Sequence, residues 1–283
     1  MSLPKRQHFV AQMLQARFTD DDGKLYFFDK RAKDRGVMQT TPTNLFVERH
    51  IYSRINKDGT KDPALERFYS GIEGRANQIV DKIVAAARAG SVPSLTTGEK
   101  SEWDNFFHHQ WKRSPDFHEN AWALADFENS LKNAMADFER DFRPLTAEER
   151  VFFQSEEGKA RMRQNAKVGA LLDPGNLVAQ VLDSRGLGVV RIGQLNKSFI
   201  IGSFPIVKLA NPGTPELAHP TTEMWFPISH DIAVTPAGMK GTEQIVIVPD
   251  EKHVRAINLA IASQSNAIAG RSRKLIESLA NPR

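Results

Sequence analysis

The residues that could do chemistry near neutral pH are first of all histidines, because imidazole is the commonest general base there. His8 follows Gln7 at the head of an apolar segment that reads as a helix. An exposed helix N-terminus offers free backbone N–H groups to an anion. The pair could therefore form part of a site, although satisfied packing of His8 against the core is the simpler interpretation.

A second candidate is His230, which lies between Ser229 and Asp231 after an apolar run. The change from apolar to polar residues predicts the end of a strand, where polar side chains often line a site. An ordinary strand-to-turn transition explains the same pattern. The three adjacent residues are no catalytic triad, since a triad must converge through the fold.

His108 and His109 lie in an aromatic helical segment, for which we favour a structural role. Neighbouring histidines on a helix point in different directions, whereas the aromatic residues recur at helical spacing. This spacing predicts a buried core stripe of Trp103, Phe106, Phe107 and Trp111.

Several classes of protein and site are excluded. The chain has 283 residues and no cysteine, which rules out disulfide scaffolds, thiolate zinc sites, iron–sulfur clusters and a cysteine nucleophile. Phosphate-binding glycine loops, zinc-protease motifs and serine-hydrolase elbows are missing from the sequence. We predict no metal site and identify no cofactor. The polar N-terminus and the lack of a long apolar run predict a soluble, cytoplasmic protein without a membrane partner.

The charge is modest and unevenly distributed along the chain. The formal net charge is +4, and 40% of the residues are hydrophobic, enough for a real core. Residues 98–167 hold 11 basic and 14 acidic residues, a net charge of −3, between two mildly basic ends. A dedicated nucleic-acid binder usually has a denser basic stripe, so we interpret most of these charges as a solvated surface.

Hydrophobic periodicity and capping residues predict the elements that would position these side chains. We expect a short helix over 7–18, a strand over 24–29 and a helical middle over about 63–184. The strand signals return over 186–250 and include a hairpin at 188–202, and one long helix over 251–279 closes the chain. These elements predict an α+β fold. We expect a largely helical middle, followed by a C-terminal antiparallel sheet. An N-terminal strand at about 20–30 is expected to join this sheet. We expect a single domain over 1–283.

The sequence resembles the DUF4238 family, a domain of unknown function. The opening Gln7-His8-Phe9-Val10 is similar to the Gln-His-x-Val-Pro opening of that family. Later landmarks follow in the same order: Phe27–Lys30, Gln110 with Arg113-Ser114-Pro115, Ile200–Pro205, Phe226–Ser229 and Asn258. The chain departs from the pattern at Ala11, where the family usually has proline. It departs again at Ser203, where the usual residue is acidic, and at His230, where the usual residue is proline. The resemblance implies no known activity.

Two functional hypotheses remain open. In the first, the protein is a hydrolase acting on nucleic acid or a nucleotide-type phosphate, with His8 as the catalytic acid or base. Its substrate-binding residues would be Gln7, Gln110, Arg113, Ser203 and His230. In the second, it is a non-enzymatic module that senses a ligand or partner, for example in cellular defence. Convergence of His8, Gln110, Ser203 and His230 in one pocket would favour the enzyme, and scatter would favour the binding module.

Overall fold

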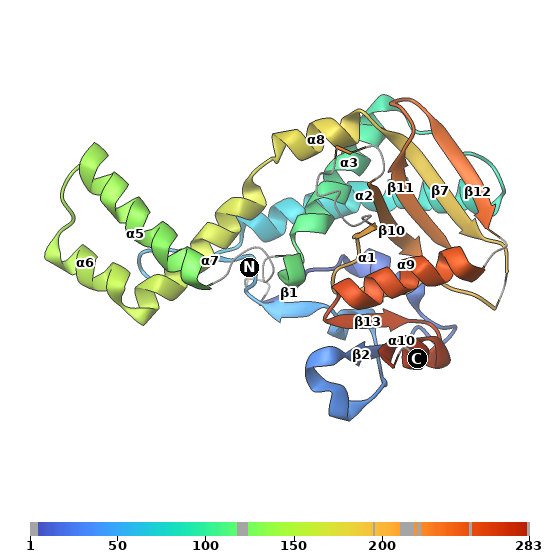
Figure 1. The fold of residues 1–283 in the computed structure, drawn as a ribbon, viewed down its shortest axis with the longest axis horizontal. Helices are drawn as coiled ribbons and strands as arrows, with labels where there is room; N and C mark the ends of the chain where they lie inside the picture. The colour runs from blue at the N-terminus through green and yellow to red at the C-terminus, as the bar shows by residue number, and fades with distance from the viewer. Residues whose placement is uncertain are drawn as a thin grey trace.

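The computed structural model describes residues 5–117, 124–194, 196–209, 218–219, 222–248 and 251–281. Its architecture is α+β, as the sequence predicts, and it combines a helical middle with several small sheets. The chain forms a body that contains the sheets and a helical arm that projects from it (Figure 1).

The N-terminal segment differs from its predicted helix. Gln7 and His8 belong to strand β1 (Arg6–His8), which pairs antiparallel with β4 (Val47–Arg49). Only α1 (Gln12–Gln15) and the 3-10 turn η1 (Ala16–Phe18) are helical. The apolar residues of this segment are still buried, but pairing with β4 replaces the first helical turn. The short elements that follow are η2 (Lys30–Arg35), β3 (Met38–Thr40), η3 (Pro42–Asn44), β5 (Arg54–Ile55) and β6 (Lys61–Asp62).

The helices of the middle begin where the sequence signals place them. Helix α2 (Ala64–Arg88) ends before Gly90, whose φ of +74° few other residues adopt readily. Capping boxes are present at the starts of α3 (Thr97–Lys112) and α6 (Ala147–Gln154). The remaining helices of this region are α5 (Leu124–Asp141), α7 (Glu156–Leu172) and α8 (Asn176–Asp183).

The main sheet has five strands in the order β12-β7-β11-β10-β9. It is mixed rather than purely antiparallel, because β12 runs parallel to β7 while the other pairs are antiparallel. The predicted hairpin over 188–202 does not form, since β7 pairs with β11 and β12 instead. The bounds are β7 (Gly186–Ile192), β9 (Val207–Leu209), β10 (Glu223–Ser229), β11 (Ile232–Ala237) and β12 (Glu243–Val248).

Helices cover both faces of this sheet. Successive side chains of a strand point to opposite faces. In β10, the Phe226 ring packs on Trp103 of α3 at 6.0 Å between centroids. The ring of the adjacent residue Trp225 packs against His253 of α9 (Glu251–Gln264), with 5.1 Å between the ring centroids. The sheet is therefore the middle of three layers, which explains why the six residues Met224–Ser229 of β10 are all buried.

A second, four-stranded sheet ties the two ends of the chain together, in the order β3-β2-β13-β8. The N-terminal strand β2 (Leu25–Asp29) pairs here with β13 (Ala267–Gly270), while β8 (Ile201–Gly202) takes the other side of β13. The expected N-terminal strand thus joins this sheet and not the larger one. The predicted closing helix is also interrupted, because β13 separates α9 from α10 (Arg273–Ala280).

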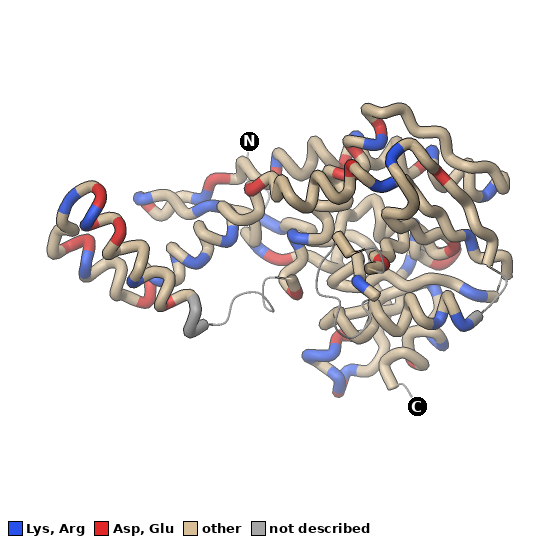
Figure 2. The backbone as a smooth tube through the Cα atoms, turned by 45° about the horizontal axis from the view of Figure 1, so that its top comes forward, with Lys and Arg blue, Asp and Glu red and all other residues tan. Residues whose placement is uncertain are grey.

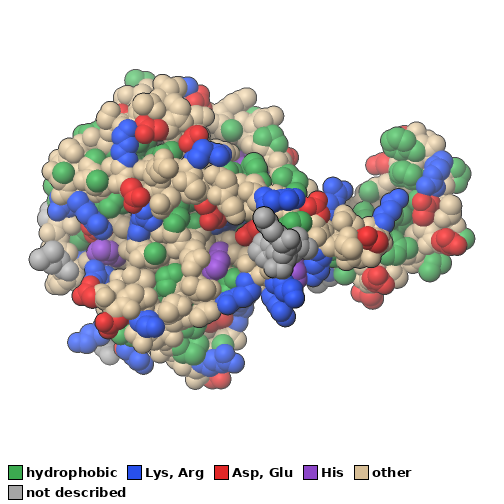
Figure 3. All heavy atoms as spheres, turned by 180° about the vertical axis from the view of Figure 1, so that it is seen from behind, with side chains coloured by type: hydrophobic (Ala, Val, Ile, Leu, Met, Phe, Trp, Pro, Cys, Tyr) green, Lys and Arg blue, Asp and Glu red, His purple; other side chains and the backbone are tan. Residues whose placement is uncertain are grey.

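The arm consists of α5, α6 and the first part of α7, and Figure 3 shows it from behind as an extension joined to the body by a narrower neck. Hydrogen bonds from α7 hold its base: Gln164 Nε2 donates to the carbonyl oxygens of Ile51 and Ser53, at 3.1 and 3.0 Å. Basic and acidic residues are interspersed over body and arm in Figure 2. Among the described residues, no helix is both long and apolar enough to cross a bilayer.

Candidate functional site

Three of the predicted site residues converge, but they bind backbone. Gln7, Gln110 and Arg113 are at most 2% exposed. Gln7 Oε1 accepts a hydrogen bond from Tyr52 N at 2.8 Å. Gln110 Nε2 and Arg113 Nε both donate to the carbonyl oxygen of Phe9, at 2.9 and 3.0 Å. Buried backbone groups outside regular structure need such partners. Gln110 and Arg113 therefore fix the segment at Phe9 to the end of α3, while Gln7 fixes β1 to Tyr52.

His8 lies beside this trio in strand β1, not at a helix N-terminus as the sequence suggested. Its Nε2 is 3.2 Å from Pro42 O and 3.3 Å from Thr43 O. Two carbonyl acceptors require Nε2 to carry the proton, which leaves Nδ1 as the basic nitrogen. The pKa of His8 is lowered, first by burial, so the ring is neutral at pH 7.

Ser203 and His230 lie at other places in the fold. Ser203 Oγ accepts from Ala267 N at 3.1 Å at the edge of β13. His230 Nδ1 lies 3.1 Å from the carbonyl oxygen of Arg17 and can donate to it. The pattern of polar residues at strand ends therefore reflects local backbone bonding, and the predicted residues do not form one cavity.

A charged cluster that the sequence reasoning missed adjoins Arg113. Arg113 Nη1 binds Glu73 at 2.6 Å, and its guanidinium carbon lies 5.1 Å from the centre of the Tyr69 ring. Burial, opposed in part by Arg113, raises the pKa of nearby Glu66 to about 7. Arg113 Nη2 and the Tyr69 hydroxyl are buried without a partner among the described residues. Both atoms are closed to solvent, so the cluster is no open binding site.

The sequence held one usable signal for this cluster. Glu66 and Glu73 are seven residues apart, which places both on one face of α2. Arg113 comes from another helix, and only tertiary packing brings it to that face.

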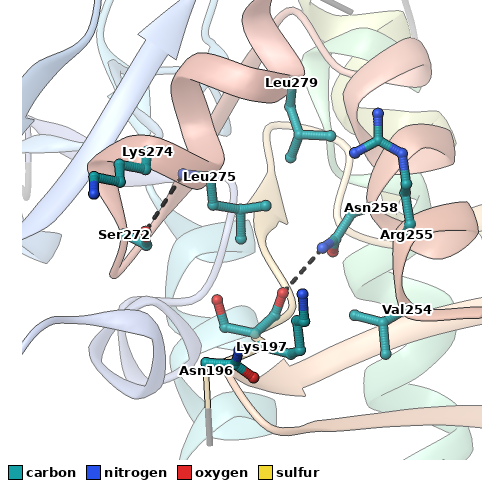
Figure 4. Close-up of a pocket in the computed structure, with 10 residues that line it drawn as sticks. Asn196, Lys197, Val254, Arg255, Asn258, Ser272, Lys274, Leu275 and Leu279 are labelled. Carbon is teal, nitrogen blue, oxygen red and sulfur yellow. Dashed lines mark hydrogen bonds between the residues drawn. The ribbon is translucent and has the colours of Figure 1, made fainter. Parts of the chain in front are cut away.

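An open cavity of about 350 Å³ lies between α9, α10 and the turn before Phe199 (Figure 4). Val254, Leu275 and Leu279 give it an apolar wall. The other lining residues are polar or basic: Asn196, Lys197, Ser198, Arg255, Asn258, Ser272 and Lys274. No carboxylate lines this cavity in the described part of the chain.

The cations of this cavity point in different directions. Figure 4 shows Lys197 and Arg255 reaching into the space between the two helices, whereas Lys274 extends away from it. Asn258 holds the segment 198–200 against α9, because its Nδ2 donates to Ser198 O at 2.9 Å and its Oδ1 accepts from Ile200 N at 3.0 Å. The cavity therefore combines two basic side chains with an apolar wall.

Of these residues the sequence pointed only to Asn258, as a family landmark, and its observed role is structural. Nothing in the spacing of Lys197 and Arg255 predicts that they line one cavity, because 57 residues that include strands of both sheets separate them. Among the described residues, no group of three or more histidine, cysteine or acidic side chains is placed to hold a metal ion.

A family model described as a protein of unknown function, DUF4238, matches residues 6–274. The chain belongs to the DUF4238 family. No curated protein and no solved structure matches the chain significantly. Membership in DUF4238 confirms the resemblance seen in the ordered motifs, while the function must be argued from the sites themselves.

Proposed function

We propose that this DUF4238 protein is a ligand-binding module that takes a phosphate-containing small molecule in the α9–α10 cavity. The observation that carries the proposal is the pairing of two inward-pointing cations, Lys197 and Arg255, with a lining in which no described residue is a carboxylate. A cavity with one sign of charge attracts ligands of the opposite sign. Phosphate oxygens are good acceptors for both guanidinium and ammonium groups.

The shape of the cavity favours an organic phosphate, such as a nucleotide. Its volume, about 350 Å³, is within the usual range for small-molecule sites. The apolar wall of Val254, Leu275 and Leu279 would hold the organic part while Arg255 and Lys197 hold the phosphate.

Polymeric nucleic acid is a weaker candidate. It binds proteins along continuous basic surfaces, and Figure 2 shows basic and acidic residues interspersed.

Binding is better supported than hydrolysis. The hydrolase hypothesis needs His8 and its polar neighbours to face a substrate. Instead, His8 Nε2 meets the carbonyl oxygens of Pro42 and Thr43, and Gln110 is bonded to the backbone at Phe9 and Ala11. The scatter of Ser203 and His230 also favours the binding module.

Isothermal titration with adenosine monophosphate and with inorganic pyrophosphate tests this proposal. We expect saturable binding by the wild-type protein that weakens as salt is added, because exposed charges are screened. Arg255→Ala should weaken binding by about tenfold or more, since a charge-assisted hydrogen bond contributes roughly 1.5–3 kcal/mol.

Lys274→Ala is the matched control. It removes one positive charge from the rim of the same cavity, yet its side chain extends away from the space. The affinity of Lys274→Ala for both probes should stay within about threefold of wild type, because a charge at the rim contributes at most about 1 kcal/mol. The proposal that this cavity binds phosphate would be refuted if both variants lost the same affinity, or if neither probe bound to the wild-type protein.

A further inference from the structure

A second cavity, of about 590 Å³, lies between α3 and α8, where no predicted site residue is found. The α3 side contributes Ser101, Glu102, Asp104, Asn105 and His108. The α8 side contributes Pro174, Asn176, Ala179, Gln180 and Asp183. Nearly all of these side chains carry polar atoms, so the cavity differs in character from the basic one between α9 and α10.

His108 is the unusual member of this lining. It is only 6% exposed, and its ring nitrogens make no hydrogen bond to any described residue. Neither ring nitrogen is among the fully buried side-chain atoms that lack a partner, so both stay open to water or a ligand in the cavity. Burial, and then Lys112, lowers the pKa of His108 to about 4. The ring is therefore neutral at pH 7 and offers one donor and one acceptor.

The position of the ring is fixed by its neighbours. Gly175 has a φ of +57°, and a Cβ atom there would come within 2.4 Å of His108 Cε1. A larger residue would thus need both a strained backbone and a displaced ring. Close packing of the Cε1–Nε2 edge against Gly175 holds the imidazole at the wall of the cavity.

The carboxylates of the cavity are already neutralised from outside it. Each of them forms an ion pair with a cation that does not line the cavity. The pairs are Glu102 with Arg75 at 3.2 Å, Asp104 with Lys100 at 2.6 Å and Asp183 with Lys240 at 2.7 Å. Neither an anion nor a cation would therefore be strongly attracted.

What the cavity does offer is mixed hydrogen-bonding capacity. The amide side chains of Asn105, Asn176 and Gln180 make no hydrogen bond to a described residue, and each can both donate and accept. Ammonium groups only donate and phosphate oxygens chiefly accept. A hydroxyl group does both, and so matches amide, imidazole and carboxylate groups together.

We propose that the α3–α8 cavity binds a neutral polyhydroxyl compound, a sugar or related polyol, with His108 as its central hydrogen-bonding residue. Ser101 and the three amides would contact further hydroxyl groups, while Pro174 and Ala179 would face the carbon skeleton. This site is separate from the proposed phosphate cavity, because the two share no lining residue.

Ligand-observed NMR and isothermal titration on the full chain test this inference, with glucose, ribose and myo-inositol as probes. Spermidine and inorganic phosphate represent the competing cationic and anionic classes. We expect saturable binding of at least one polyol. His108→Phe keeps a ring against Gly175 but removes both hydrogen bonds, and should weaken this binding about tenfold.

Two further variants keep the test decisive if His108→Phe does not fold. Gln180→Ala changes an exposed lining residue and should weaken polyol binding severalfold. Gln78→Ala, on the exposed surface of α2 outside the cavity, is the matched control and should bind like wild type. The proposal is overturned if no polyol binds, if spermidine or phosphate is bound in this cavity instead, or if Gln180→Ala leaves polyol affinity unchanged.

Discussion

Glu66 shows how one half-buried carboxyl can make stability depend on pH. Burial is the main reason that its pKa rises to about 7, and the charge of Glu73 adds to this rise. The folded protein therefore holds a proton at pH 5–7 that the unfolded chain, with an ordinary glutamate pKa, releases. This stabilising contribution is complete below about pH 4.5 and is lost as the pH rises through 7.

We therefore expect Glu66→Gln to raise the free energy of unfolding, compared with wild type, more at pH 8 than at pH 5. Glutamine keeps the size of the side chain and cannot ionise, so the cost of burying a charge disappears. Because Glu66 is partly exposed, solvent screening reduces this effect, and we expect a relative gain of the order of 1 kcal/mol between the two pH values.

Urea denaturation of both proteins at pH 5 and pH 8 measures this gain. Glu148→Gln in the exposed part of α6 serves as the control and should show no such trend. A difference between Glu66→Gln and wild type that does not change with pH would contradict the raised pKa.

At the same scale, the sequence identified polar residues whose observed partners are backbone groups. Gln7, Gln110 and Arg113 lie near one another and bind backbone groups. A sequence shows that a glutamine is present and not whether its partner is a ligand or a carbonyl group. Lys197 and Arg255 could not be assigned to one cavity in advance for the same reason, since this depends on how α9 packs.

At the scale of elements, the sequence predicted the helix starts that have a capping residue or a breaker beside them. Capping boxes and breakers located α2, α3 and α6. The closing helix was predicted too long because Val254, Ile257, Ile261 and Ile268 continue the helical period through the break. Just after α9, Ser265 bonds to the backbone of Phe204, with its Oγ 3.2 Å from both Phe204 N and Phe204 O. This long-range contact depends on the tertiary fold and leaves no local signal in the sequence.

The aromatic stripe of α3 gives the clearest energetic test of an element. Trp103 is 2% exposed and packs on Phe106, Phe107 and Phe226, with ring centres 5.9–6.3 Å apart. Trp103→Ala should therefore destabilise the protein by about 3–5 kcal/mol, measured by urea denaturation.

Phe142→Ala is the matched control, since Phe142 is 78% exposed and should change stability little. If Trp103→Ala instead kept normal stability and lost a bound ligand, the stripe would be a stacking surface and not core.

At the scale of the whole molecule, the ends of the chain are joined through one sheet. Strand β2 lies between β3 and β13, and β13 in turn pairs with β8. The sequence predicted that the N-terminal strand must find distant partners, because a lone strand cannot satisfy its backbone groups. It could not identify β13 as the partner, since that segment reads as helix.

Deletion of residues 1–35 should consequently abolish cooperative folding and not merely trim the protein. The deletion removes β1 and β2, exposes one edge of β13 and uncovers Ile268, which is 1% exposed in the intact fold. Long-range pairs such as Phe28 with Ile268 and Phe27 with Ala269 would all be lost.

We expect an insoluble product, or one without a sharp thermal transition by circular dichroism. Supplying residues 1–35 as a separate, co-expressed fragment should restore solubility, because the missing strand can then pair in trans. A shortened chain that stays soluble and melts at the wild-type temperature would show that the sheet joining the two ends does not hold the molecule together.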